Sequence, residues 1–168
     1  HANVVRTLGL INDKEGTPRV LVIEWIDGPT LASYVAHHEQ AFAWKELERI
    51  SRDLIAGVRA LHDAHVLHRD IKPENVMIRS DGSAVVMDIG VAELEGEHTL
   101  NTSVKDFVGS LRWASRQFIL EGGFEVADDV YSVAATLLYL WSGKEPYAEV
   151  KRKPAVAHYA AIQPPEVG

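Results

Sequence analysis

HRDIKPEN, His68 to Asn75, is the stretch that decides the fold, because it places a carboxylate, two fixed positive charges and a carboxamide in one short loop. A carboxylate at Asp70 can accept a hydrogen bond from a hydroxyl nucleophile and then accept its proton. Lys72 can neutralise the charge of a transferring phosphoryl group, and Asn75 offers a neutral oxygen ligand for Mg²⁺. This combination favours phosphoryl transfer, which depends on positioning and charge neutralisation more than on covalent chemistry.

The residues on either side of this loop predict short strands and a second metal ligand. HVL (65–67) and VMI (76–78) are typical of short strands, and RSDGSAVVM (79–87) predicts a tight hairpin with Asp81 and Gly82 at its turn. This hairpin would bring Asp88, an anionic oxygen ligand for Mg²⁺, back beside Asn75. Taken singly, Asp70 is explained as a turn residue, Lys72 as a solvated charge and Asn75 as a local cap. Their joint spacing with Asp88 favours the chemical interpretation.

Hydrophobic patterning predicts the remaining elements. Two strands, Val4 to Ile11 and Arg19 to Ile26, are expected to form a hairpin whose second strand is apolar enough to be buried. The pattern also predicts a short helix from Thr30 to His37, a longer one from about Trp44 to Ala64, and a buried central helix from Asp128 to Ser142. The roughly thirty residues after Met87 are interpreted as a long loop. We expect a final helix to begin at Pro154.

Composition excludes several classes of protein. With 168 residues the chain fits one domain, and a net charge of −7 without a block of five or more like charges disfavours nucleic-acid binding and a polybasic membrane anchor. The absence of cysteine excludes disulfides and thiolate metal sites, which fits a cytoplasmic location. The longest apolar run, Val130 to Trp141, is too short to span a bilayer. The chain begins at His1 without Met, and we expect both of its ends to be cut.

Several motifs together resemble a known family. HRDIKPEN resembles the catalytic loop of eukaryotic-type (Hanks-type) serine/threonine protein kinases, and MDIG (87–90) resembles their Mg²⁺-binding DFG triplet. Other stretches resemble the same kinases in the same order: HANVV (1–5), VIEWIDG (22–28), GSLRWASRQ (109–117) and DDVYSVAATLLYLWSGKEPY (128–147). The resemblance implies an α+β, protein kinase-like fold with a mainly helical C-lobe and a remnant N-lobe hairpin. Residues 1–26 would be N-lobe strands and the start of the hinge, and residues 27–168 a C-lobe truncated before its final helices.

The resemblance also implies ATP and Mg²⁺ as cofactors and assigns residues to the nucleotide. The backbone of Glu24 and Ile26 would contact adenine, Ile23 would gate the pocket behind it, and Met77 would form the floor under the ring. Ile23 and Met77 are expected to be core residues in any case. Lys72 would contact the transferring phosphate.

Further residues are assigned supporting roles by the same resemblance. Ser110 would hydrogen-bond toward Asp70 and Lys72, although an ordinary loop serine is an equal alternative. Asp129 would hold the backbone of the catalytic loop, or would simply cap its helix. His68 is interpreted as a packed structural histidine. The spacing of His62, His65 and His68 crosses a helix end, so these side chains are not expected to converge on a metal ion.

Regulation is predicted around Arg69. In kinases with Arg before the catalytic Asp, the Arg commonly binds a phosphorylated residue, and Asp106 occupies the usual phosphosite position. A permanent Asp106–Arg69 ion pair would then replace phosphorylation. The alternative, held equal, is that Asp106 is solvated and Thr102 or Ser103 is the phosphosite.

The chain also departs from the family pattern. No Gly-x-Gly-x-x-Gly occurs, and SRQ (115–117) replaces the usual APE, so Gln117 cannot form the ion pair of a Glu. The expected function of the parent protein is ATP-dependent phosphorylation of Ser/Thr hydroxyls on protein substrates, with the segment alone inactive. One alternative is a pseudokinase or a fragment that binds nucleotide or partners, and the other is a small-molecule phosphotransferase. The oligomeric state is left open.

Overall fold

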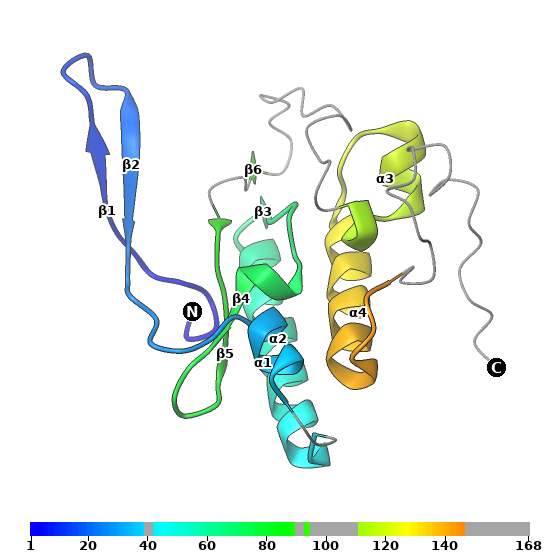
Figure 1. The fold of residues 1–168 in the computed structure, drawn as a ribbon. Helices are drawn as coiled ribbons and strands as arrows, with labels where there is room; N and C mark the ends of the chain where they lie inside the picture. The colour runs from blue at the N-terminus through cyan, green and yellow to red at the C-terminus, as the bar shows by residue number, and fades with distance from the viewer. Residues whose placement is uncertain (39–41, 90–92, 95–110, 147–168) are drawn as a thin grey trace.

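The computed structural model describes residues 1–38, 42–89, 93–94 and 111–146 (Figure 1). Its strands are β1 (Thr7–Asn12), β2 (Pro18–Ile23), β3 (Val66–Leu67), β4 (Val76–Ile78), β5 (Ala84–Val86) and β6 (Glu93–Leu94). Its helices are α1 (Leu31–Ala36), α2 (Trp44–Asp63), α3 (Arg116–Glu121) and α4 (Val126–Ser142), with 3-10 turns at Pro73–Asn75 and Leu111–Trp113. The described strands pair antiparallel as β1–β2, β3–β6 and β4–β5. The result is a mainly helical α+β fold with small sheets.

The core forms around α2, which packs against β5 and α4. Its buried residues lie three or four apart, so they form one apolar stripe. The predicted helix from Trp44 to Ala64 is therefore confirmed. The short helix is also confirmed as α1, where the Thr30 side chain caps the first turn by accepting a hydrogen bond from the Ser33 amide at 3.1 Å. The stripe meets these fully or nearly fully buried side chains of the other elements: Leu31, Val76, Ile78, Val86 and Leu140.

The first five residues form a strap along β5. The amides of Val5 and Val86 donate to the carbonyls of Val86 and Asn3, each at 2.9 Å, and the Asn3 side chain donates to the Ala84 carbonyl at 2.9 Å. The strap also crosses α2 at Gly57, where an added Cβ would lie 2.4 Å from the Asn3 carbonyl oxygen. Only glycine allows this close approach of strap and helix.

The hairpin of β1 and β2 stands away from the rest of the described chain (Figure 1). The prediction that its second strand is buried is wrong, since Val20 is 51% exposed and Ile23 is 36% exposed. The reason is that the hairpin stands away from the helices, so no described element packs over the faces of β1 and β2 (Figure 1). Ile23 is therefore not a core residue, contrary to expectation, whereas the predicted Asp81–Gly82 hairpin is confirmed between β4 and β5.

Two other expectations need correction. The central helix begins at Val126 and is buried on one face only, because Val130 and Leu138 are exposed and Trp141 is 73% exposed. The stretch interpreted as a long loop contains β6 and the 3-10 turn Leu111–Trp113, and α3 begins near its end. Residues 95–110 of that stretch lie outside the described residues. The helix predicted from Pro154 lies outside the described residues. In the described ranges, no helix combines the length and apolar character needed to cross a membrane.

Candidate active site

The loop that follows β3 is fixed by His68, which is completely buried. Its Nε2 lies 2.7 Å from the carbonyl oxygen of Met87, and its Nδ1 lies 3.3 Å from the Asp70 amide nitrogen. A carbonyl can only accept and an amide can only donate, so we assign the proton of the ring to Nε2. His68 thus ties the loop to the residue before Asp88, as expected of a packed structural histidine.

Asp70 lies at the centre of this loop with its two carboxylate oxygens in different surroundings. Oδ2 accepts hydrogen bonds from Lys72 Nζ at 2.5 Å and from Asn75 Nδ2 at 2.9 Å. The Asn75 amide also donates to the Asp70 carbonyl at 2.8 Å, which closes the loop on itself. Oδ1 is buried and accepts no hydrogen bond from the described residues. Burying a carboxylate oxygen without a hydrogen-bond donor costs free energy. Oδ1 is therefore available to accept a hydrogen bond from a bound molecule.

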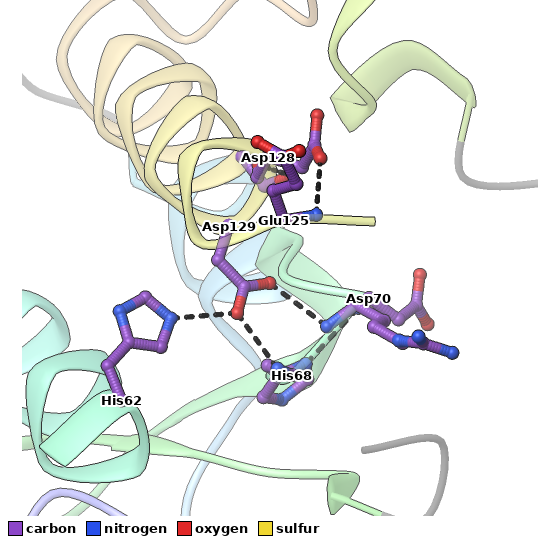
Figure 2. A network of polar contacts seen from close by, with 8 residues as sticks. His62, His68, Asp70, Glu125, Asp128 and Asp129 are labelled. Carbon is purple, nitrogen blue, oxygen red and sulfur yellow. Dashed lines mark hydrogen bonds and ion pairs between the residues drawn. The ribbon is translucent and has the colours of Figure 1, made fainter. Parts of the chain in front are cut away.

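Asp129 on α4 holds the same loop from behind. Figure 2 shows its carboxylate between His62 and the loop backbone, where Oδ2 accepts from the His68 amide at 2.8 Å and Oδ1 accepts from the Arg69 amide at 3.0 Å. Arg69 has a φ of 70°, a strained conformation for a non-glycine residue. The carboxylate, which is 0% exposed, therefore stabilises a loop geometry that the backbone does not favour by itself.

His62 completes this network and was not predicted as part of the site. It lies in the last turn of α2, and its Nε2 is 2.9 Å from Asp129 Oδ2 (Figure 2). The sequence carries no signal for this contact, because the two residues are 67 positions apart. Three elements thus meet at one carboxylate: α2, the loop after β3, and α4.

The half-buried side chain of Arg69 lies near an aromatic ring and within reach of the charge of Asp129. Its guanidinium carbon lies 5.8 Å from the centroid of the Phe124 ring, within the range of a cation–π contact. Burial lowers the pKa of the guanidinium from its ordinary value, while the negative charge of Asp129 opposes that shift.

Two oxygen-bearing residues lie on the other side of the loop. The Met87 amide donates to the Asn75 carbonyl at 2.8 Å, so the chain returns beside Asn75 and Asp88 follows immediately. Among the described residues, the Asn75 side chain bonds through its amide nitrogen, so its amide oxygen is available as a ligand. Asp88 is exposed and has a φ of 53°. An amide oxygen and a carboxylate are ligands that suit Mg²⁺.

These two residues do not form a complete metal cage. Among the described residues, no group of three or more His, Cys, Asp or Glu side chains is placed to hold a metal ion. Mg²⁺ commonly binds through one or two protein oxygens, with water and substrate phosphates as the other ligands. The donor set of Asn75 and Asp88 therefore fits a cation that arrives with a phosphate-bearing substrate.

The residues expected to contact a nucleotide are only partly brought together. Ile26 is buried with Val5 and Val85, and half-buried Met77 packs against this cluster. Glu24 lies beyond the end of β2, and its Oε1 accepts from the Arg6 amide at 2.9 Å and lies 3.3 Å from an Arg79 nitrogen. Ile23 lies at the exposed end of β2. Ile26 and Met77 thus share one cluster, and Ile23 does not belong to it.

Comparison with known families shows which family the chain belongs to. The family model described as protein kinase domain matches residues 1–163. The chain belongs to the protein kinase domain family. Its mixture of helices and small sheets is that of a partial protein kinase domain, as the sequence motifs predict.

The chain is similar to protein kinases of Arabidopsis thaliana and Caenorhabditis briggsae. It is 26% identical over 159 residues, 95% of its length, to mitogen-activated protein kinase kinase kinase ANP1 of Arabidopsis thaliana, of which it covers 23%. It is 27% identical over 146 residues, 86% of its length, to serine/threonine-protein kinase cst-1 of Caenorhabditis briggsae, of which it covers 29%. It is 30% identical over 152 residues, 89% of its length, to a probable L-type lectin-domain containing receptor kinase of Arabidopsis thaliana, covering 22% of it. The chain thus spans less than a third of these kinases.

Four of the predicted residues of this kinase domain lie outside the described residues. They are Thr102, Ser103, Asp106 and Ser110. The predicted contact of Ser110 with Asp70 and the alternative phosphosites around Arg69 therefore stay predictions.

Proposed function

We propose that the protein carrying this chain transfers the γ-phosphoryl group of ATP to serine and threonine hydroxyls of proteins. The observation that supports this most directly is Asp70, whose Oδ1 is buried without a donor while its Oδ2 is held by Lys72 and Asn75. A carboxylate fixed on one side and open on the other can orient an incoming hydroxyl. The names of several relatives, such as serine/threonine-protein kinase cst-1, support the acceptor class.

In the proposed reaction each residue acts at a stated atom. The acceptor hydroxyl donates a hydrogen bond to Asp70 Oδ1, its oxygen forms a bond to the γ-phosphorus, and the bond from that phosphorus to the bridging oxygen breaks. ADP leaves with the electron pair of that bond, and the hydroxyl proton passes to Asp70. Lys72 places a positive charge beside the reacting groups. Asn75 and Asp88 would hold Mg²⁺, which when bound neutralises negative charge on phosphate oxygens.

We further propose that residues 1–26 derive from the N-lobe and the start of the hinge, and that residues 27–168 derive from the C-lobe. The hairpin of β1 and β2, which stands apart from the helices, supports this division (Figure 1). The strap of residues 3–5 links the two parts across this division, because the strap pairs with β5.

The test is phosphoryl transfer by the full natural protein. With Mg²⁺, radiolabelled ATP and a Ser/Thr peptide library, we expect label on peptide, and Asp70→Asn should reduce turnover at least about a hundredfold, as loss of a general base commonly does. Asp63→Asn is the matched control, since Asp63 lies on the exposed end of α2 and pairs only loosely with Arg59 at 3.7 Å. Equal turnover in Asp70→Asn and wild type would remove Asp70 from the mechanism.

The same assay separates the second candidate, a silent relative that binds nucleotide. The observation that favours it is Gln117, which stands where the family pattern has the Glu of an ion pair. Saturable ATP binding without transfer to any peptide would support this candidate. Transfer to small hydroxylated molecules in place of peptides would support a small-molecule phosphotransferase.

A further inference from the structure

One arginine holds the chain at both sides of the β1–β2 hairpin. Arg79 follows β4 directly, and its Nη1 donates a hydrogen bond to the Ala2 carbonyl at 2.9 Å. Its Nη2 lies 3.3 Å from Glu24 Oε1. Ala2 precedes β1 and Glu24 follows β2, so this side chain binds the chain where it enters the hairpin and where it leaves it. We call Arg79, Ala2 and Glu24 the Arg79 clamp.

Glu24 also closes the open end of the hairpin. Its Oε1 accepts a hydrogen bond from the Arg6 amide at 2.9 Å, and its own amide donates to the Arg6 carbonyl at 2.9 Å. Arg79 therefore attaches a closed pair of residues to the end of β4. The side chains of Arg79 and Glu24 are 28% and 21% exposed, so water screens their ion pair only in part.

The Arg79 clamp lies next to the apolar cluster around Ile26. Ile26 comes two residues after Glu24, and Met77, which packs against the cluster, comes two residues before Arg79. The Arg79 amide continues the β4–β5 ladder by donating to the Ser83 carbonyl at 2.9 Å. Residues two apart on a strand point to the same side, so Met77 and Arg79 leave β4 in the same direction. The clamp thus helps to set the spacing between Ile26 and Met77.

The same cluster reaches Asp88, the candidate metal ligand. Met87 and Ile89, on either side of Asp88, both pack against the cluster and are half-buried. In ATP one ribose links the adenine ring to the phosphates, so phosphates held at Asp88 leave the ring within reach of these apolar side chains. Ligand sites commonly combine an apolar lining with a few polar groups. The cluster therefore offers a surface for adenine beside the ligands for the phosphates.

We infer that Arg79 is a positioning residue for ATP, because it holds the open end of the hairpin against β4 and so keeps Ile26 and Met77 spaced for the adenine ring. This inference rests on the proposed function. Without the clamp, the hairpin is attached less firmly and the surface for adenine loses its spacing. The loop that carries Asp70 is held separately, through the two backbone amides that Asp129 accepts. Binding of the acceptor peptide should therefore not change.

The experiment uses the full natural protein and measures binding of radiolabelled ATP with Mg²⁺ by equilibrium dialysis. In Arg79→Gln we expect the Kd for ATP to rise about fivefold, since two contacts of a charged but partly exposed group are lost. In steady-state kinetics the KM for ATP should rise as well, while kcat and the KM for peptide stay within about twofold of wild type. Arg59→Gln is the matched control, because the Arg59 side chain is 79% exposed and lies 3.7 Å from Asp63.

Glu24→Gln tests the clamp from its other side. It keeps an oxygen for the Arg6 amide and removes only the negative charge, so it should raise the Kd for ATP about threefold even where Arg79→Gln folds poorly. In the Arg79→Gln background the same change should add nothing, because its partner is already lost. Arg79→Lys keeps the charge, but its single nitrogen cannot occupy both positions, so it should recover part of the affinity.

The outcomes distinguish this inference from the proposed function. An unchanged Kd for ATP in both Arg79→Gln and Glu24→Gln, or equal increases in the Michaelis constants for ATP and peptide, would overturn the positioning role while the kinase activity stands. A wild-type protein that binds ATP but transfers no phosphate to any peptide would remove the proposed function, and the comparison of Kd values would still decide the inference. A wild-type protein that binds no ATP would remove both.

Discussion

The buried carboxylate of Asp129 binds residues from two other parts of the chain. Its oxygens receive two backbone amides of the Asp70 loop and the imidazole of His62. Each donor contributes separately, because hydrogen bonds to a charged group in a buried site are stronger than neutral ones. Within the described part of the chain, the side-chain polar contact of His62 is with Asp129 and not with Asp70, so we expect its effect on the reaction to pass through Asp129.

We predict that His62→Ala lowers kcat of the full protein about tenfold, because Asp129 loses one of its donors and the Asp70 loop is held less firmly. His62→Gln keeps a donor and should recover part of the loss. His37→Ala, at the end of α1, is the control. Steady-state kinetics at saturating ATP and peptide measures the effect, and an unchanged kcat in His62→Ala would show that two donors suffice.

The sequence predicts which residues belong to this candidate site, but it does not predict contacts between residues that are far apart in the chain. Asp70, Lys72, Asn75 and Asp88 were identified because they are close in sequence and their chemistry is complementary. His62 was missed because its partner lies 67 residues away, and only the packing of α2 against α4 brings the two together. Long-range side-chain pairs of this kind leave no periodic pattern in a single sequence.

At the scale of elements, length and local turn chemistry decide what the sequence predicts. The 20-residue α2 repeats its apolar stripe several times, and the β4–β5 hairpin has a glycine at φ 79° in its turn, so both were predicted. The six-residue α3 is too short to show a period, although Ser115 is an N-cap signal in retrospect. The exposed faces of β2 and α4 were missed because apolar residues predict burial but not the partner that provides it.

Gly57 provides a test at this scale. Replacing a glycine in a helix interior with alanine ordinarily stabilises it by roughly 1 kcal/mol. Here the new Cβ would lie 2.4 Å from the Asn3 carbonyl oxygen, so we predict that Gly57→Ala instead destabilises the protein. The expected loss is about 1–3 kcal/mol, typical of overpacking.

Urea unfolding of the wild type and of Gly57→Ala, followed by circular dichroism, measures the difference in their free energies of unfolding. Arg52→Ala on the exposed side of α2 is the control, with an expected effect within about 0.5 kcal/mol. If Gly57→Ala is more stable than the wild type, the strap does not pack closely enough against α2 to exclude a Cβ at this position.

For the molecule as a whole, the main feature is its uncovered apolar surface. Val20 and Ile11 are directly opposed in the β1–β2 register and both are exposed. A two-stranded hairpin is marginal by itself, and its free edges and apolar faces favour association. We therefore predict that the isolated 168-residue chain self-associates as its concentration rises.

Sedimentation velocity over a range of concentrations would measure this association. Ile11→Thr with Val20→Thr changes one opposed pair and should reduce it, whereas Leu120→Thr on the exposed side of α3 should not. An isolated chain that stays monomeric at every concentration would contradict the prediction.

We also predict that the isolated chain transfers little or no phosphate. It contains no glycine-rich stretch to cover the phosphates of ATP, so part of the charge stabilisation expected for this reaction is lacking. Incorporation of radiolabelled phosphate into peptides by the purified chain is the measurement. Steady incorporation that disappears in Asp70→Asn would prove the prediction wrong.

The strap of residues 3–5 imposes an order on folding. The β4–β5 hairpin closes a short loop, whereas the Asn3–Ala84 contact joins residues 81 positions apart. Each doubling of loop length adds about 0.6 kcal/mol of closure entropy, so the strap is disfavoured by about 2 kcal/mol relative to the hairpin. We therefore expect the hairpin to form early and the strap to dock afterwards, where it crosses α2 at Gly57. In a chain synthesised from its N-terminus, residues 3–5 are made well before β5, yet they can dock only after β5 has been made.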